Sequence, residues 1–133
     1  MPVVTGEFEV KMAPEDISSV AAGSGIGRMS LDKHYHGALE ANGKGEMLAY
    51  MDHALGSGAY VAMERVQGSL DGCAGAFLLH HSGVMTRNAP ALAVKVVPDS
   101  GDGELAGLAG TLNIRIEGGK HYYDFDYTLP AVA

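Results

Sequence analysis

The feature that most constrains this chain is a repeated alternation of apolar and polar residues, interrupted at short intervals by glycine. The longest example covers residues 60–83. Two alternating arms flank Asp71-Gly72, a dipeptide that readily adopts the positive φ angles of a tight hairpin turn. Because side chains along a strand point alternately to opposite faces, each arm indicates a half-buried strand. The pattern therefore predicts a long β-hairpin at the centre of the fold.

Similar alternation predicts strands on both sides of this hairpin. They cover residues 6–12, 28–40 and 46–51 before it, and 92–97, 111–116 and 121–129 after it. Turns are expected at Asn42-Gly43, 56–58, 88–90 and Gly118-Gly119, and Pro14 is expected to end the first strand. Residues 14–27 read as an irregular segment with at most one helical turn.

About eight consecutive strands, joined mostly by short turns, indicate an antiparallel meander. Strands of this number can close on themselves, which removes exposed edges. The 133 residues fit one domain, residues 1–133. The sequence therefore predicts an all-β fold with a closed antiparallel barrel, and a β-sandwich is the second choice.

Composition excludes several classes of protein. The net charge of -7 and the absence of a Lys/Arg cluster argue against nucleic-acid binding. No apolar stretch approaches the ~20 residues of a membrane-spanning helix, and we expect no membrane partner. A single cysteine, Cys73, fits a reducing compartment, and the N-terminus lacks the pattern of a signal peptide. We therefore expect a cytoplasmic protein.

A glycine-rich connection at 98–110 contains spacings that resemble a phosphate-binding loop. A nucleotide fingerprint needs a strand before it and a helix after it, in a βαβ unit. Here a strand follows instead of a helix. We therefore expect no nucleotide binding. We also expect no cofactor.

The aliphatic faces of the strands indicate which side chains point into a barrel. The inward sets are Phe8/Val10/Met12, Met29/Leu31/Leu39, Leu92/Val94/Val96, Leu112/Ile114/Ile116 and Tyr123/Phe125/Tyr127. In the central hairpin we place Glu64 and His81 inside and Arg65 and His80 outside. Glu64 and Arg65 lie on opposite faces of one strand, so only one of them can point inward. We choose Glu64, because a carboxyl group that can be protonated is easier to bury than a guanidinium group.

This assignment leaves a few polar groups inside: Lys33, Tyr60, Glu64, His81, Tyr123 and, less firmly, His121. One interpretation is that they pair with one another and fill the barrel, with Lys33 and Glu64 as natural partners. The other is a ligand-facing acid/base cluster, with Glu64, Lys33 and His81 as the catalytic residues. Under it, a hydrophobic ligand would contact the inward aromatic residues Tyr35, Tyr60, Phe77, Tyr123 and Phe125.

The six histidines raise the question of a metal site. His34 and His36 share one strand face and could chelate an ion, but we expect that face to be solvated, and it offers no evident third ligand. His80 and His81 point to opposite sides of their strand. We therefore predict no metal site, and the roles of His34, His36, His53 and His80 stay open.

Several segments together resemble a bacterial family of unknown function, domain-of-unknown-function family three-two-two-four. They are RMSLDK (28–33), GEML (45–48), GAYVAMERV (58–66), HSG (81–83), VPDSGDGELAGLAG (97–110) and KHYYDFDY (120–127). The resemblance covers about residues 5–129. It implies an allene oxide cyclase-like, calycin-like barrel that holds a ligand inside and forms homo-oligomers. The catalytic residues of the plant cyclases do not align with any local motif of this chain.

Three functions are compatible with these features. The first is a cofactor-independent cyclase or isomerase acting on a hydrophobic substrate, with Glu64 as acid/base and Lys33 or His81 tuning it. The second is a non-catalytic carrier of a small ligand. The third is a structural, oligomeric module with a filled barrel.

Overall fold

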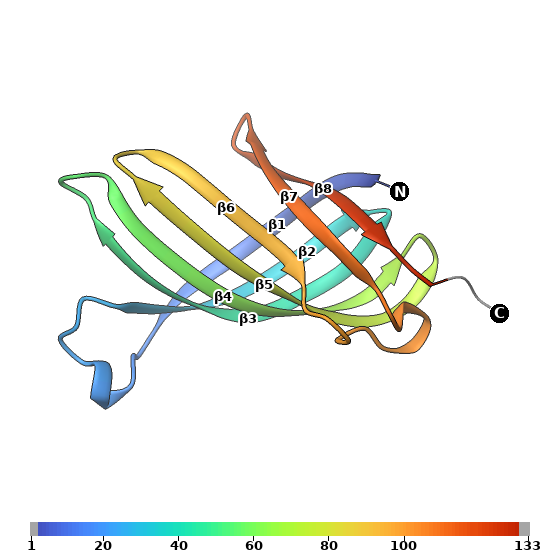
Figure 1. Cartoon of the computed structure of the whole chain (residues 1–133), viewed down its shortest axis with the longest axis horizontal. Helices are drawn as coiled ribbons and strands as arrows, with labels where there is room; N and C mark the ends of the chain where they lie inside the picture. Colours follow the sequence, from blue (N-terminus) through green and yellow to red (C-terminus); the bar gives the residue numbers. More distant parts are fainter. Residues whose placement is uncertain (1–2, 131–133) are drawn as a thin grey trace.

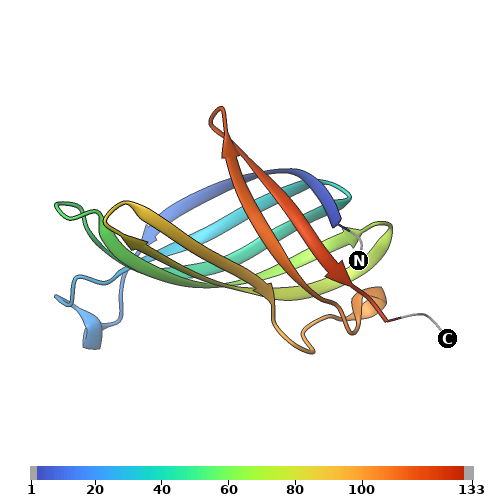
Figure 2. The same ribbon diagram turned by 45° about the horizontal axis from the view of Figure 1, so that its top comes forward.

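The chain folds into a closed antiparallel barrel of eight strands, which confirms the predicted fold class. The structure is a computed structural model that describes residues 3–130. Each strand pairs with the next along the chain, and β8 pairs with β1 (Figure 1). The rotated view in Figure 2 shows the long central strands curving around the interior. The prediction of one domain over residues 1–133 extends beyond the described residues at both ends.

The elements follow one another without a long helix. The strands are β1 Val3–Glu15, β2 Gly27–Gly37, β3 Leu39–Asp52, β4 Ser57–Leu70, β5 Cys73–Thr86, β6 Ala89–Val96, β7 Ala109–Glu117 and β8 Lys120–Thr128. Two short 3-10 helices, η1 Ser19–Ala21 and η2 Gly103–Leu105, lie in the β1–β2 and β6–β7 connections. Within residues 3–130, no helix has the length and apolar character needed to cross a membrane.

The hairpin β4–β5 forms as its alternation predicts. Asp71 and Gly72 have φ angles of 49° and 82°, the positive values that a two-residue type I′ turn requires. Pairing then continues from Leu70–Cys73 to Gly58–Met85. This turn fixes the register of both strands, so that every second residue of each faces the barrel interior.

The predicted turn at Asn42-Gly43 is wrong. The chain reverses direction at Gly37, whose φ angle is 109°, and Asn42 and Gly43 lie within β3, opposite His34 and Lys33. A Cβ atom at Gly43 would collide with the carboxylate of Glu64. Glycine is therefore needed here for a close side-chain approach inside the barrel, and not for a turn.

Pro14 also does not end β1, which continues to Glu15 and pairs Pro14 with Met29. Past Phe8, β1 has pairs with β2 alone, because its pairing with β8 covers Val3 to Phe8. A proline is tolerated on such an edge, where one side of the strand needs no backbone donor.

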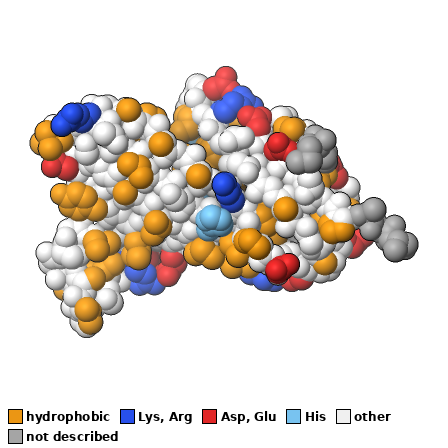
Figure 3. All heavy atoms as spheres, in the orientation of Figure 1, with side chains coloured by type: hydrophobic (Ala, Val, Ile, Leu, Met, Phe, Trp, Pro, Cys, Tyr) orange, Lys and Arg blue, Asp and Glu red, His pale blue; other side chains and the backbone are white. Residues whose placement is uncertain are grey.

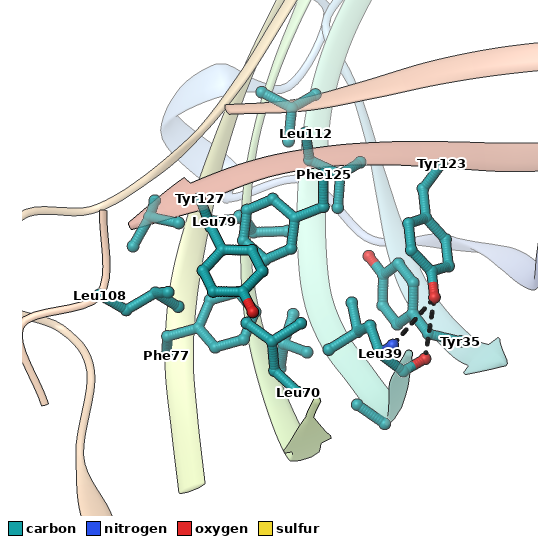
Figure 4. Close-up of a cluster of buried hydrophobic side chains, with 14 of the residues drawn as sticks. Tyr35, Leu39, Leu70, Phe77, Leu79, Leu108, Leu112, Tyr123, Phe125 and Tyr127 are labelled. Atoms are coloured by element: carbon teal, nitrogen blue, oxygen red, sulfur yellow. Dashed lines mark hydrogen bonds between the residues drawn. The ribbon is translucent and has the colours of Figure 1, made fainter. Parts of the chain in front are cut away.

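The core occupies one end of the barrel, and its side chains alternate along the strands as expected (Figure 4). It consists of Phe8, Tyr35, Leu39, Ala41, Val66, Leu70, Phe77, Leu79, Val94, Val96, Leu105, Leu108, Leu112, Tyr123, Phe125 and Tyr127. Leu105 and Leu108 come from the β6–β7 connection, which strand alternation did not predict as part of the core. They help to fill this end of the barrel.

Three residues predicted to face the core are exposed: Met12, Leu92 and Ile116. Each lies on a part of its strand that has no paired strand on one side. Met12 is past the β1–β8 pairs, and the other two lie on either side of Lys95–Thr111, the single β6–β7 pair. Alternation gives the face on which a side chain lies, but not whether an opposite wall covers it.

Tyr123 joins β8 to the β2–β3 turn. Its hydroxyl group accepts a hydrogen bond from the backbone N–H of Leu39 at 3.0 Å (Figure 4). It donates to the carbonyl oxygen of His36 at 2.8 Å. We expect Tyr123→Phe to lower the free energy of unfolding by about 1–3 kcal/mol, because the buried N–H of Leu39 loses its partner. Urea denaturation checks this, with Tyr122→Phe as the matched control. Equal losses in both variants would contradict it.

Candidate functional site

Four polar side chains from three strands meet inside the barrel. Lys33 and Tyr35 lie on β2, Glu64 on β4 and His81 on β5. Between β2 and β4 runs β3, where Gly43 pairs with Lys33 and Gly45 pairs with Glu64. Because Gly43 has no side chain, the groups on β2 can reach across β3 to the carboxylate of Glu64, whereas Gly45 allows a close approach of the β4 backbone.

The carboxylate of Glu64 is the centre of this cluster, which we call the Glu64 cluster. Its Oε1 accepts from Lys33 Nζ at 3.0 Å and lies 2.8 Å from His81 Nε2, and its Oε2 accepts from the hydroxyl group of Tyr35. Only 1% of Glu64 and 6% of Lys33 is exposed. The predicted Lys33–Glu64 pair and the inward positions of Glu64 and His81 are therefore confirmed, as are the outward positions of Arg65 and His80.

The surroundings keep Glu64 ionised. Burial by itself raises the pKa of its carboxyl group, but the hydrogen bond to His81, the charge of Lys33 and the hydrogen bond from Tyr35 together bring the pKa below its ordinary value. Burial, followed by the charge of Glu64, raises the pKa of Tyr35 well above its ordinary value. Tyr35 therefore stays a neutral donor, and the cluster is a buried ion pair whose carboxylate also contacts a histidine and a tyrosine.

An apolar pocket lies at the opposite end of the barrel from the core. Its volume is about 320 Å³, and β3, β4, β5 and β6 form its walls. It is lined by Met47, Ala49, Tyr50, Met51, Gly58, Ala59, Tyr60, Gly83, Val84, Met85, Pro90, Ala91 and Leu92. Figure 3 shows hydrophobic side chains gathered over the left half of the molecule, the end at which the β3–β4 and β5–β6 turns lie in Figure 1.

Tyr60 lies between the pocket and the Glu64 cluster. It is half-buried, lines the pocket, and its ring centroid is 6.5 Å from that of His81. A Cβ atom at Gly83 would collide with the ring of Tyr60, so the glycine leaves the space that the ring occupies. Burial, and then the charge of Glu64, raises the pKa of Tyr60. Tyr60 thus stays neutral, and its ring separates the apolar pocket from His81.

The aromatic residues predicted to contact a ligand do not all lie at this pocket. Tyr60 lines it, whereas Phe77 and Phe125 pack against each other in the core at a ring-centroid distance of 5.9 Å. Tyr123 binds the β2–β3 turn and Tyr35 binds Glu64, and both are fully buried. A ligand role for these four stays a prediction, and their positions are those of core residues.

Sequence reasoning missed most of the pocket. Met47, Ala49 and Met51 on β3 line it, but the misplaced turn left the inward face of this strand unassigned. Part of the signal was present, because Gly43, Gly45 and Met47 alternate with Asn42, Lys44 and Glu46, and Leu48 then interrupts the pattern.

We expect Glu64→Gln to destabilise the fold by about 3–5 kcal/mol, because it leaves the ammonium group of Lys33 buried without a counter-charge. Adding Lys33→Met should recover part of this loss, since it removes that charge. Urea denaturation of the single and double variants measures the coupling. Arg65→Met, which breaks only an exposed pair with Asp102, is the control and should cost less than about 1 kcal/mol.

The pH dependence of the same measurement adds a second check. Because folding lowers the pKa of Glu64, its contribution to stability is present above the ordinary value of 4.5 and is lost as the pH falls through the lower folded-state pKa. The difference in the free energy of unfolding between wild type and Glu64→Gln should therefore become smaller at acidic pH. A difference that is unchanged from pH 7 to the acid limit of folding would contradict the ionised cluster.

Comparison with known proteins identifies the family. The family model described as "Protein of unknown function (DUF3224)" matches residues 4–127. A crystal structure of a protein of unknown function from the same family, from Shewanella oneidensis MR-1, is 47% identical and superimposes with a TM-score of 0.91, covering 99% of each chain. No curated protein matches this chain. The family match over nearly the whole chain agrees with the resemblance in the sequence, and the chain belongs to the DUF3224 family of β-barrel proteins.

Proposed function

We propose that this barrel binds a small hydrophobic molecule in the pocket formed by β3–β6. The observation that supports this most directly is the contrast between the two ends of the barrel. Buried side chains fill one end, whereas the other has an apolar pocket of about 320 Å³. This volume falls at the small end of the ~300–1,000 Å³ typical of ligand sites, so the proposed ligand is small.

The lining residues define the chemistry of the ligand. Met47, Met51 and Met85 offer flexible, polarizable surfaces that adapt to an apolar shape. The ring of Tyr60 adds aromatic surface to this almost entirely apolar lining. The proposed ligand is therefore mainly hydrocarbon.

Filling the pocket should abolish this binding. Ala49→Phe puts a ring into the space lined by Ala49, and we expect it to weaken binding of N-phenyl-1-naphthylamine, an apolar fluorescent probe, by at least about tenfold. Ala93→Phe, on the exposed face of β6, is the matched control and should bind as wild type does. Fluorescence titration measures both. Equal binding by wild type and Ala49→Phe, with both folded by circular dichroism, would contradict the proposal.

A second candidate is a cofactor-independent cyclisation or isomerisation of the bound molecule, as the resemblance to allene oxide cyclase-like barrels implies. The supporting observation is the position of Tyr60, beside both the pocket and His81. In this reaction Glu64 is the general acid/base, and Lys33 and His81 adjust the pKa of its carboxyl group. Pocket shape and one such group are sufficient for an isomerisation.

The two candidates differ in turnover. Native mass spectrometry of the protein from its source cells would identify a co-purified molecule, and chromatography would then follow its conversion to a product of equal mass. A catalytic barrel should lose conversion in Glu64→Gln while that variant, if folded, still binds the molecule. Unchanged turnover would exclude the acid/base role, and binding without conversion in wild type would favour the carrier.

Outward-facing Leu48, Val61 and Met63 form an exposed apolar surface on β3 and β4. This surface is compatible with the third candidate, an oligomeric module. Homo-oligomer formation and a cytoplasmic location stay predictions.

A further inference from the structure

Two histidines and a glutamate meet on the outside of the barrel, away from the Glu64 cluster and the pocket. Glu40 Oε2 lies 3.3 Å from His34 Nε2 and 3.6 Å from His36 Nδ1. One ligand atom from each of the three side chains lies within 4.8 Å of the other two. We call this group the His34/His36/Glu40 triad.

The β2–β3 hairpin brings the triad together. His34 and His36 are two residues apart on β2, so both point outward, and their rings stack with centroids 4.4 Å apart and planes 13° apart. Glu40 lies on β3, next to the Tyr35–Ala41 pair, because the chain has reversed at Gly37. The backbone N–H of Gly37 also donates to Glu40 Oε1 at 3.4 Å.

The hairpin turn is held in place from inside the barrel. Tyr123 on β8 hydrogen-bonds to the carbonyl oxygen of His36 and to the backbone N–H of Leu39, the residues on either side of the turn. The backbone of the triad is therefore anchored to a fully buried side chain. Such anchoring fixes the backbone from which the three exposed side chains extend, and the stacked rings turn about their side-chain torsions to bring both imidazole planes onto one ion.

Two of the three spacings in the triad match those of metal ligands, and the third, between the two imidazole nitrogens, is within 4.8 Å. Two ligand atoms, each about 2.1 Å from a tetrahedral ion, lie about 3.4 Å apart. The distances from the carboxylate oxygen to the two imidazole nitrogens, 3.3 and 3.6 Å, are close to this value. The three side chains are about half exposed, which leaves the remaining coordination positions open to water.

Glu9 on β1 supports His36 from the other side. Its carboxylate lies 2.7 Å from His36 Nε2, so this nitrogen carries the proton of the hydrogen bond in the neutral ring. The lone pair of Nδ1 is then directed to the side of Glu40, where it can bind a cation. A carboxylate that orients a ligating histidine in this way is the usual support of protein metal sites.

We propose that the His34/His36/Glu40 triad binds one divalent transition-metal ion of the zinc, nickel or copper class. Imidazole nitrogen favours these ions, whereas magnesium and calcium prefer sites made only of oxygen ligands. The acidic side chains of Glu7 and Glu9 on the neighbouring strand β1 add negative charge that attracts a cation. Water completes the coordination of the ion.

Calorimetric titration of the metal-stripped, tag-free chain with zinc chloride tests this site. We expect one zinc ion per chain, and at least about tenfold weaker binding in His34→Gln, His36→Gln and Glu40→Gln. Glu9→Gln, which removes only the support of His36, should weaken binding by about 10–100-fold. The exposed histidines elsewhere supply matched controls, and His53→Gln and His80→Gln should bind zinc as wild type does.

Copper gives an independent count of the ligands. The electron paramagnetic resonance spectrum of the chain with one equivalent of Cu²⁺ should show coupling to two imidazole nitrogens, and to one in His34→Gln. The proposal is overturned if wild type shows no saturable zinc binding, or if the triple variant of the triad binds as wild type does. It is also overturned if His53→Gln or His80→Gln loses affinity as strongly as the triad variants.

Discussion

The interior of this barrel depends on the buried carboxylate of Glu64. An ionised group with 1% exposure is tolerated only if its oxygens find donors, and Lys33, Tyr35 and His81 supply them. These donors lie on two strands that do not adjoin each other, so the strand between β2 and β4 must leave space. Gly43 provides it, because a Cβ atom there would collide with the carboxylate of Glu64. The cluster thus links β2, β4 and β5 through one charge, across the middle of the sheet.

The Glu64 cluster also separates two parts of the interior with different properties. On one side, aromatic and aliphatic residues from all eight strands pack together, and Leu105 and Leu108 close that end. On the other side, β5 and β6 extend beyond the single β6–β7 pair. The apolar pocket lies there. The ligand proposal therefore rests on the end of the barrel beyond the β6–β7 pair, while the stability of the fold rests on the packed end.

Strand alternation predicted the barrel and the orientation of Glu64, His81, Arg65 and His80, because side-chain direction in a strand is a local property. It failed where distant residues decide the structure. Asn42-Gly43 has the sequence of a turn, but its glycine accommodates Glu64. With the turn misplaced, Glu40 was assigned to the same strand as His36, about 13 Å away in an extended chain. The true turn at Gly37 folds Glu40 back beside the histidines, and no local pattern contains that information.

One segment of β2 serves both faces of the sheet. Lys33 and Tyr35 point inward to Glu64, and His34 and His36 point outward to Glu40 and Glu9. A slip of one residue in the β2–β3 register would expose the first pair and bury the second. It would leave Glu64 without its cation and put two histidines in an apolar core. Any alternating strand can bury one hydrophobic face. In this hairpin the hydrogen bonds and ion pairs on both faces also have to form, so they specify the register more strictly than hydrophobic burial alone.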